Sequence, residues 1–117
     1  MNIKNYTQII GRIGKDLEIK SSENTSFLNF TIAVDDSYYN TKEDKKVERS
    51  YWINCVAKGK MAEHITKYYA KGDQIAIQGK LVSRSYENKE GQTIYITEIE
   101  IETAEITLRR EAKNKED

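Results

Sequence analysis

Aromatic side chains on the polar faces of strands are the features of this sequence that most favour a chemical role. The run 49–58 is rich in aromatic and β-branched residues, which predicts a β-strand. Because side chains alternate between the faces of a strand, Trp52, the only tryptophan, shares its face with Asn54 and Lys58 and not with Ile53. A flat π surface beside positive charge suits stacking of an unpaired nucleic-acid base. Burial of the indole in a subunit interface or under a loop remains an alternative.

A second aromatic repeats this placement in the segment 74–86, which also predicts a strand. Its inward positions are expected to be Ile75, Ile77 and Leu81, and its outward positions Gln78, Lys80, Arg84 and Tyr86. Tyr86 is therefore displayed beside cations, as Trp52 is.

Lysine and arginine near such aromatics can neutralise phosphates and release counterions, which makes affinity fall as salt rises. The candidate phosphate contacts are Arg12, Lys15, Arg49, Lys58, Lys60, Lys80 and Arg84. For any one of them, an ordinary solvated surface position is an equal alternative. Weaker aromatic candidates, which core, hairpin or interface packing would also explain, are Tyr39, Tyr51 and Tyr95.

The charges of the chain balance, with 19 Lys and Arg against 19 Asp and Glu. A neutral total counts against a nucleic-acid ligand, but the distribution is uneven. Cations are frequent in 42–60, whereas four glutamates, Glu98, Glu100, Glu102 and Glu105, crowd one late segment. We expect the two regions to be separate, with the glutamates on a solvated or repelling face. The chain then has a locally basic groove although its net charge is zero.

Several function classes are disfavoured. One cysteine excludes an internal disulfide and a cysteine-cluster metal site, and one histidine disfavours a zinc site. Cys55 lies on the apolar face of its strand and His64 in a helical segment, so they form no convincing nucleophile and base. No apolar run has the length of a membrane span, and the N-terminus lacks a secretory signal. We therefore expect a cytoplasmic protein that is not an enzyme, binds no metal or cofactor and does not associate with membranes.

Five strands and one helix are expected. The strands cover about 6–13, 28–35, 49–58, 74–86 and 93–108, and the helix has an apolar stripe of Met61, Ile65, Tyr68 and Tyr69 with Gly72 at its C-terminus. The order β-β-β-α-β-β suits an oligonucleotide-binding (OB) fold, a five-stranded Greek-key barrel, over residues 1–108. Residues 109–117 are expected to form a disordered charged tail.

Two connections and one strand of this barrel can be specified further. Long hairpins are expected at 36–48 and 85–92, the second turning at Glu90-Gly91. In the last strand, Ile94 and Ile96 are out of phase with Ile99 and Ile101. A β-bulge near 97–98, or passage from one sheet environment to another, would reconcile the two phases.

Several segments, in their order and spacing, resemble bacterial and phage single-stranded-DNA-binding proteins over residues 6–108. The segments are Gly11–Glu18, Phe30–Val34 followed by Ser37-Tyr38, Trp52–Glu63, Tyr69–Asp73 and Gly79–Leu81. The resemblance implies an OB fold that holds single-stranded DNA by stacking on Tyr38, Trp52 and Tyr86. It also implies a homotetramer or dimer that serves replication, recombination or repair.

Some positions depart from the family pattern. Tyr38 and Tyr86 stand where cellular members usually have tryptophan, Lys58 where an aromatic is common, and Leu17 where proline is usual. The sequence given ends at Lys115-Glu116-Asp117 without the acidic, apolar tip that recruits partner enzymes, so recruitment is not expected and a phage, plasmid or accessory version is. Two alternatives remain: an OB-fold protein-interaction or replication-restart module, and a single-stranded RNA binder.

Overall fold

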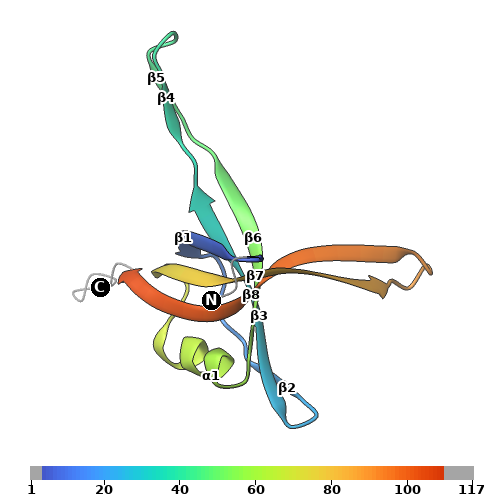
Figure 1. Ribbon diagram of the computed structural model, residues 1–117. Coiled ribbons are helices and arrows are strands. Elements are labelled where there is room, and N and C mark those ends of the chain that lie inside the picture. Colours follow the sequence, from blue (N-terminus) through green and yellow to red (C-terminus); the bar gives the residue numbers. More distant parts are fainter. Residues whose placement is uncertain (1–3, 110–117) are drawn as a thin grey trace, which may run out of the picture.

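A closed ring of five strands forms the body of the protein, as the computed structural model, which describes residues 4–109, shows (Figure 1). The five strands are β1 (Thr7–Ile13), β3 (Thr25–Asp35), β6 (Ser50–Lys58), β7 (Gln74–Glu87) and β8 (Thr93–Leu108). They are ordered β1-β7-β8-β6-β3, and a β1–β3 pairing closes the ring. Helix α1 (Gly59–Tyr68) connects β6 to β7, as expected. The predicted OB fold is confirmed.

The core is filled by alternate residues of the strands. In β3, Leu28, Phe30 and Ile32 are buried, while Asn29 is exposed on the opposite face. Ile75 and Ile77 of β7 are also fully buried, as expected. The inward assignment of Leu81 is wrong, because its side chain is 49% exposed. Beyond Gly79 the strand leaves the barrel, so the same face no longer has a core to cover.

Three hairpins project from the barrel as arms (Figure 1). The β7–β8 arm turns at Asn88–Gln92, where Gly91 has a φ of 78°, and the arm beyond β3 and β6 ends in β4 (Tyr38–Asn40) and β5 (Lys45–Val47). Both positions were expected. The third arm, in which β2 (Lys20–Ser22) pairs with β3, was not. Glu23 and Asn24 form its two-residue turn with positive φ, a conformation that asparagine tolerates better than most residues.

Strand β8 contains the expected phase change, but no bulge near 97–98. Its pairing with β7 is regular from Glu87↔Thr93 to Gly79↔Ile101, and the unmatched residues are Glu102 and Thr107. The strand passes from the arm into the barrel, so Glu98 is buried on one face and Ile99 on the other. The alternative of two sheet environments is confirmed.

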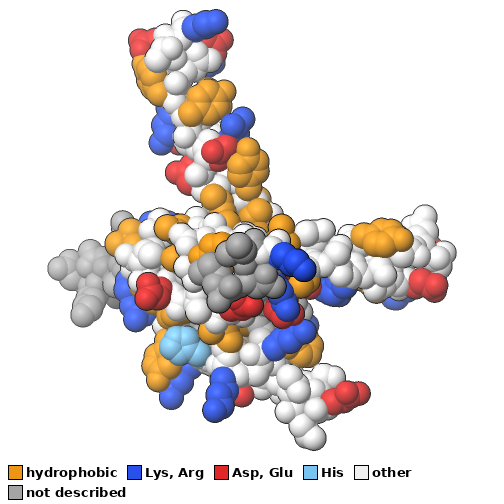
Figure 2. All heavy atoms as spheres, viewed as in Figure 1, with side chains coloured by type: hydrophobic (Ala, Val, Ile, Leu, Met, Phe, Trp, Pro, Cys, Tyr) orange, Lys and Arg blue, Asp and Glu red, His pale blue; other side chains and the backbone are white. Residues whose placement is uncertain are grey.

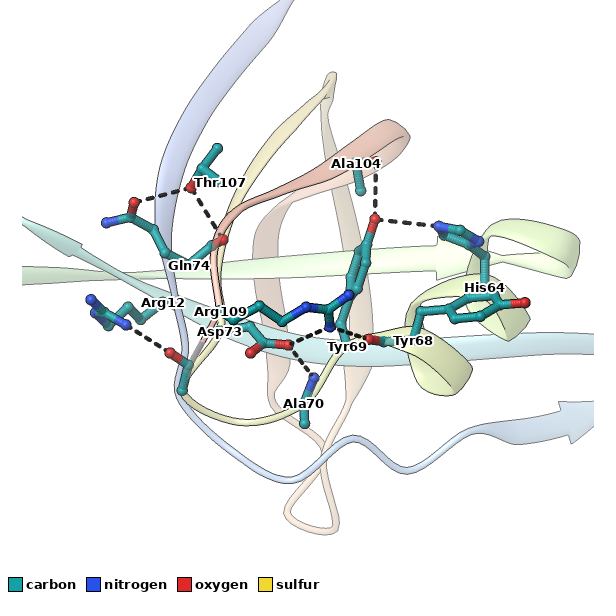
Figure 3. A network of polar contacts seen from close by, with 11 residues as sticks. Arg12, His64, Tyr68, Tyr69, Ala70, Asp73, Gln74, Ala104, Thr107 and Arg109 are labelled. Carbon is teal, nitrogen blue, oxygen red and sulfur yellow. Dashed lines mark hydrogen bonds and ion pairs between the residues drawn. The ribbon is translucent and has the colours of Figure 1, made fainter. Parts of the chain in front are cut away.

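The C-terminal end of α1 is fastened to the barrel by polar contacts (Figure 3). The Tyr69 hydroxyl donates to the Ala104 carbonyl at 3.2 Å, and the Ala70 amide donates to the buried Asp73 carboxylate at 2.9 Å. Arg109 donates to the Tyr68 carbonyl at 3.0 Å and lies 3.9 Å from Asp73. These contacts hold Arg109, the residue after β8, against the C-terminal end of α1.

Two details of the helix prediction need correction. Ile65 and Tyr69 face the core as expected, but Tyr68 is 51% exposed and does not belong to the buried stripe. Gly72 has the expected positive φ of 95°, yet it lies in the turn before β7 and not at the helix end, where Tyr69 is extended.

The predicted tail lies outside the described residues except for Arg109. The one helix of residues 4–109 is neither long nor apolar enough to cross a membrane.

Candidate nucleic-acid interface

A groove opens where two of the arms separate. Strands β6 and β8 run parallel but pair only at Cys55↔Ile99 and Val56↔Glu100. On the N-terminal side of this contact, β6 continues with β3 into one arm and β8 continues with β7 into another (Figure 1). The groove lies in the resulting fork.

Polar residues line the floor of this groove and charged residues its walls. A cavity of about 310 Å³ holds Asn29, Thr31 and Asn54 from the β3–β6 side, Arg84, Ile96 and Glu98 from the β7–β8 side, and Lys15 and Asp16 from the loop after β1. A second cavity of about 370 Å³ continues it with Phe27, Val56, Lys58, Val82 and Glu100, sharing Asn29, Arg84 and Glu98. The buried Thr31 hydroxyl has no hydrogen-bond partner among the described residues.

Trp52 and Tyr86 stand at the two sides of the fork. Trp52 lies two residues before Asn54 on β6, and Tyr86 two residues after Arg84 on β7, so each continues the groove-lining face of its own strand by about 7 Å. The exposed fractions are 63% for Trp52 and 47% for Tyr86. Figure 2 shows hydrophobic side chains displayed along both of these arms. The structure thus puts the two aromatics predicted from strand parity beside one groove.

Three of the groove cations, Lys58, Lys80 and Arg84, are already paired with carboxylates. Arg84 donates from Nε to the buried Glu98 at 2.8 Å. The Glu100 carboxylate lies 3.3 Å from the Lys58 ammonium and 3.6 Å from that of Lys80. The expectation that the late glutamates occupy a separate face is therefore wrong for these two. Because β8 lies between β6 and β7, its outward glutamates meet the cations of both neighbours, and Figure 2 shows acidic and basic side chains side by side on the barrel.

Tyr38 and Arg49 form a separate unit on the arm that extends from β3 and β6 and ends in β4 and β5. The Arg49 guanidinium lies over the Tyr38 ring at 5.1 Å from its centroid and pairs with Asp36 at 2.9 Å. The hydrogen bond to Asp36 raises the pKa of Arg49. One face of the Tyr38 ring is therefore covered by a cation. Neither residue lines the groove.

Two other predicted cations also lie outside the groove. Arg12 donates to the Gly72 carbonyl at 2.8 Å and lines a different hollow with Ile10, Asp35 and Lys46. Lys60 is exposed in the first turn of α1. Of the seven candidates, the structure brings together Lys15, Lys58, Lys80 and Arg84.

Sequence reasoning missed the polar floor and the paired glutamates. Asn29 and Thr31 alternate with the apolar residues of β3, so strand parity could have found them beside Asn54. No local signal marks Glu98 and Glu100 as groove residues, because their contacts depend on how β6, β7 and β8 assemble.

Two titratable residues remain to be placed, Cys55, which borders the groove cavity, and His64, which does not. Cys55 is buried, as expected, and burial raises the pKa of its thiol to about 12. His64 is exposed on α1 and lies 3.3 Å from the Tyr69 hydroxyl.

A closed five-stranded barrel with a helix after its third strand, and a polar groove flanked by exposed aromatics and cations, defines an OB-fold of the oligonucleotide-binding class. The sequence model of the single-strand binding protein family matches residues 4–107. The chain belongs to this family.

Individual relatives agree with this assignment. The chain is 32% identical over 114 residues to "Single-stranded DNA-binding protein 1" of Staphylococcus aureus strain MSSA476, covering 97% of this chain and 69% of that protein. It is 35% identical over 108 residues to "Single-stranded DNA-binding protein 1" of Streptococcus pyogenes serotype M18, covering 92% and 81%. It is 35% identical over 96 residues to "Single-stranded DNA-binding protein 2" of Staphylococcus aureus strain Mu50, covering 81% and 66%.

Proposed function

We propose that the fork between the β3–β6 and β7–β8 arms binds single-stranded DNA without regard to sequence. The observation that carries the proposal is the placement of Trp52 and Tyr86 on the two sides of a groove lined by Lys15, Lys58 and Arg84. Membership of the single-strand binding protein family supports it.

Each group has a defined task. Stacking of a base on an exposed aromatic contributes roughly 1–3 kcal/mol and tolerates any base, because every base has a π face. Cations contact phosphates, and each contact adds about 0.7 to the slope of log affinity against log salt for single strands. The exposed Asn29 and Asn54 side chains can exchange hydrogen bonds with whatever base or sugar edge enters the groove. In a duplex the bases are already stacked and paired, so their faces are not free for Trp52 or Tyr86.

Further parts of the proposal concern the whole protein. Binding is its activity, without catalysis, in the cytoplasm of a bacterial cell or a phage-infected host, during replication, recombination or repair. It assembles as a dimer or tetramer, which the exposed apolar side chains of Ile10 on β1 and Leu108 on β8 support. Mass measurement with and without oligo-dT tests the assembly.

Fluorescence of the only tryptophan tests the binding itself. Oligo-dT is expected to quench Trp52 emission, more weakly as salt rises, while a duplex of equal length leaves the emission unchanged. Competition with a matched RNA oligomer separates DNA from RNA binding, because the 2′-hydroxyl is the main difference between them. If the Trp52 emission does not change when oligo-dT is added, the result would instead favour a protein-interaction module.

A further inference from the structure

The Glu100 carboxylate forms ion pairs with two groove cations, Lys58 and Lys80. It lies opposite Val56 of β6 on one side and opposite Lys80 of β7 on the other, so its carboxylate sits between Lys58 and Lys80. Its side chain is 28% exposed, against 62% for Lys58 and 46% for Lys80. The carboxylate is thus more enclosed than either ammonium group, and it remains open to the groove.

We propose that Glu100 is an internal counter-ion that a DNA phosphate must displace, and that it thereby sets the affinity and the salt dependence of binding. This inference rests on the proposed function. A carboxylate and a phosphate offer the lysines the same kind of charged oxygen. Binding at this point is then an exchange of ion pairs and not the capture of an unpaired phosphate.

The neighbouring Glu98 has a different part. Its side chain is 6% exposed and its ion pair uses Nε of Arg84, which is one of five N–H donors on the guanidinium. Glu98 can therefore keep its bond while Arg84 turns other donors toward a phosphate. Glu100 differs, because each of its partners concentrates its charge on one ammonium nitrogen, so a phosphate that approaches either lysine meets the carboxylate at that same nitrogen.

The exchange has a measurable consequence for salt dependence. When phosphate takes the lysines, the released Glu100 carboxylate attracts a cation from solution. This uptake cancels part of the counterion release that normally drives binding. The wild-type protein should therefore show a shallower salt slope than its groove cations alone would give.

Glu100→Gln tests this, because it keeps the shape of the side chain and removes its charge. We expect oligo-dT to bind about threefold to tenfold more tightly at low salt. The log–log salt slope should steepen by roughly 0.7, the contribution of one contact. Glu102→Gln is the matched control: it removes the same charge from an exposed position on the same strand. It should leave both affinity and slope close to wild type.

A double-mutant cycle distinguishes displacement from simple repulsion of DNA by a negative charge. In a Lys58→Gln/Lys80→Gln background, Glu100→Gln should no longer strengthen binding. An equal gain in both backgrounds, or equal behaviour of Glu100→Gln and Glu102→Gln, overturns the inference. Either result leaves the proposed function intact, provided that oligo-dT still quenches the wild-type protein. Unfolding midpoints of all variants confirm that the comparison is between folded proteins.

Discussion

The indole of Trp52 lies over Gly14, the residue that follows β1. A Cβ at position 14 would overlap the six-membered ring of Trp52. Gly14 is not among the glycines of the described chain with positive φ, so its backbone suits alanine. Glycine at position 14 therefore makes room for the indole because it has no side chain, and not because its backbone has an unusual conformation.

Gly14→Ala is accordingly expected to displace the indole without disturbing the fold. Because the ring is the movable end of an exposed side chain, the unfolding midpoint should stay close to wild type, while oligo-dT binding weakens by about 1 kcal/mol. Gly11→Ala is the contrasting variant, since its Cβ would meet the Ala33 carbonyl oxygen at 2.6 Å. It should lower stability. Thermal unfolding and fluorescence titration separate the two effects, and a Gly14→Ala protein with wild-type affinity would contradict the role given to the ring.

The two stacking candidates should not contribute equally. Trp52→Ala is expected to weaken binding by about 2–3 kcal/mol and Tyr86→Ala by about 1–2 kcal/mol, because indole offers the larger surface. Fluorescence anisotropy of a labelled oligo-dT measures both variants without relying on tryptophan. Equal or reversed losses would show that the stacking assignment is wrong.

Cys55 makes stability depend on pH in the alkaline range. Burial raises the pKa of its thiol from 9.0 to about 12, so above pH 9 the unfolded chain loses this proton while the folded protein keeps it. Stability is therefore unaffected below pH 9 and falls as pH rises toward 12, by up to about 1.4 kcal/mol per pH unit from this group. Urea unfolding at pH 8 and pH 10 should show a smaller loss for Cys55→Ala than for wild type. An identical loss in both proteins would contradict this.

At the scale of the elements, the strand or loop that carries a cation determines whether the cation lies in the groove. Lys15 follows β1 and lines the groove, whereas Lys60 lies in the first turn of α1. Lys15→Gln is expected to weaken oligo-dT binding and to reduce the salt slope by about 0.7, while Lys60→Gln leaves both near wild type. Salt titrations of the two variants provide a matched comparison. Similar losses would mean that the general field of the protein, and not the groove, attracts DNA.

Alternation along a strand predicted Trp52 and Tyr86, because the face of a residue depends only on its position in a regular strand. The same rule failed for Leu81, since a strand can continue beyond the barrel with the core no longer beneath it. It also could not reveal that Glu98 and Glu100 lie among cations, because those contacts join three strands that are distant in sequence. The OB topology was predictable from element order, and the fork was not.

For the whole molecule, all the side chains proposed to contact DNA lie between Lys15 and Tyr86, and the barrel is complete at Leu108. Removing residues 111–117 should therefore leave the affinity for oligo-dT within about twofold of wild type, since no phosphate or base contact is lost. Fluorescence titration of the shortened chain measures this. A large change would assign the tail a part in binding.

The contacts of Arg109 with the end of α1 also determine how the protein can be handled. Arg109 follows β8 directly and contacts the end of α1, whereas the fork lies at the other end of β8. A linker joined directly after Arg109 would therefore start about 30 Å along β8 from Glu100. Such a linker would attach the protein to a sensor chip or a bead with its groove facing the solution. The single tryptophan would then serve as a built-in optical reporter.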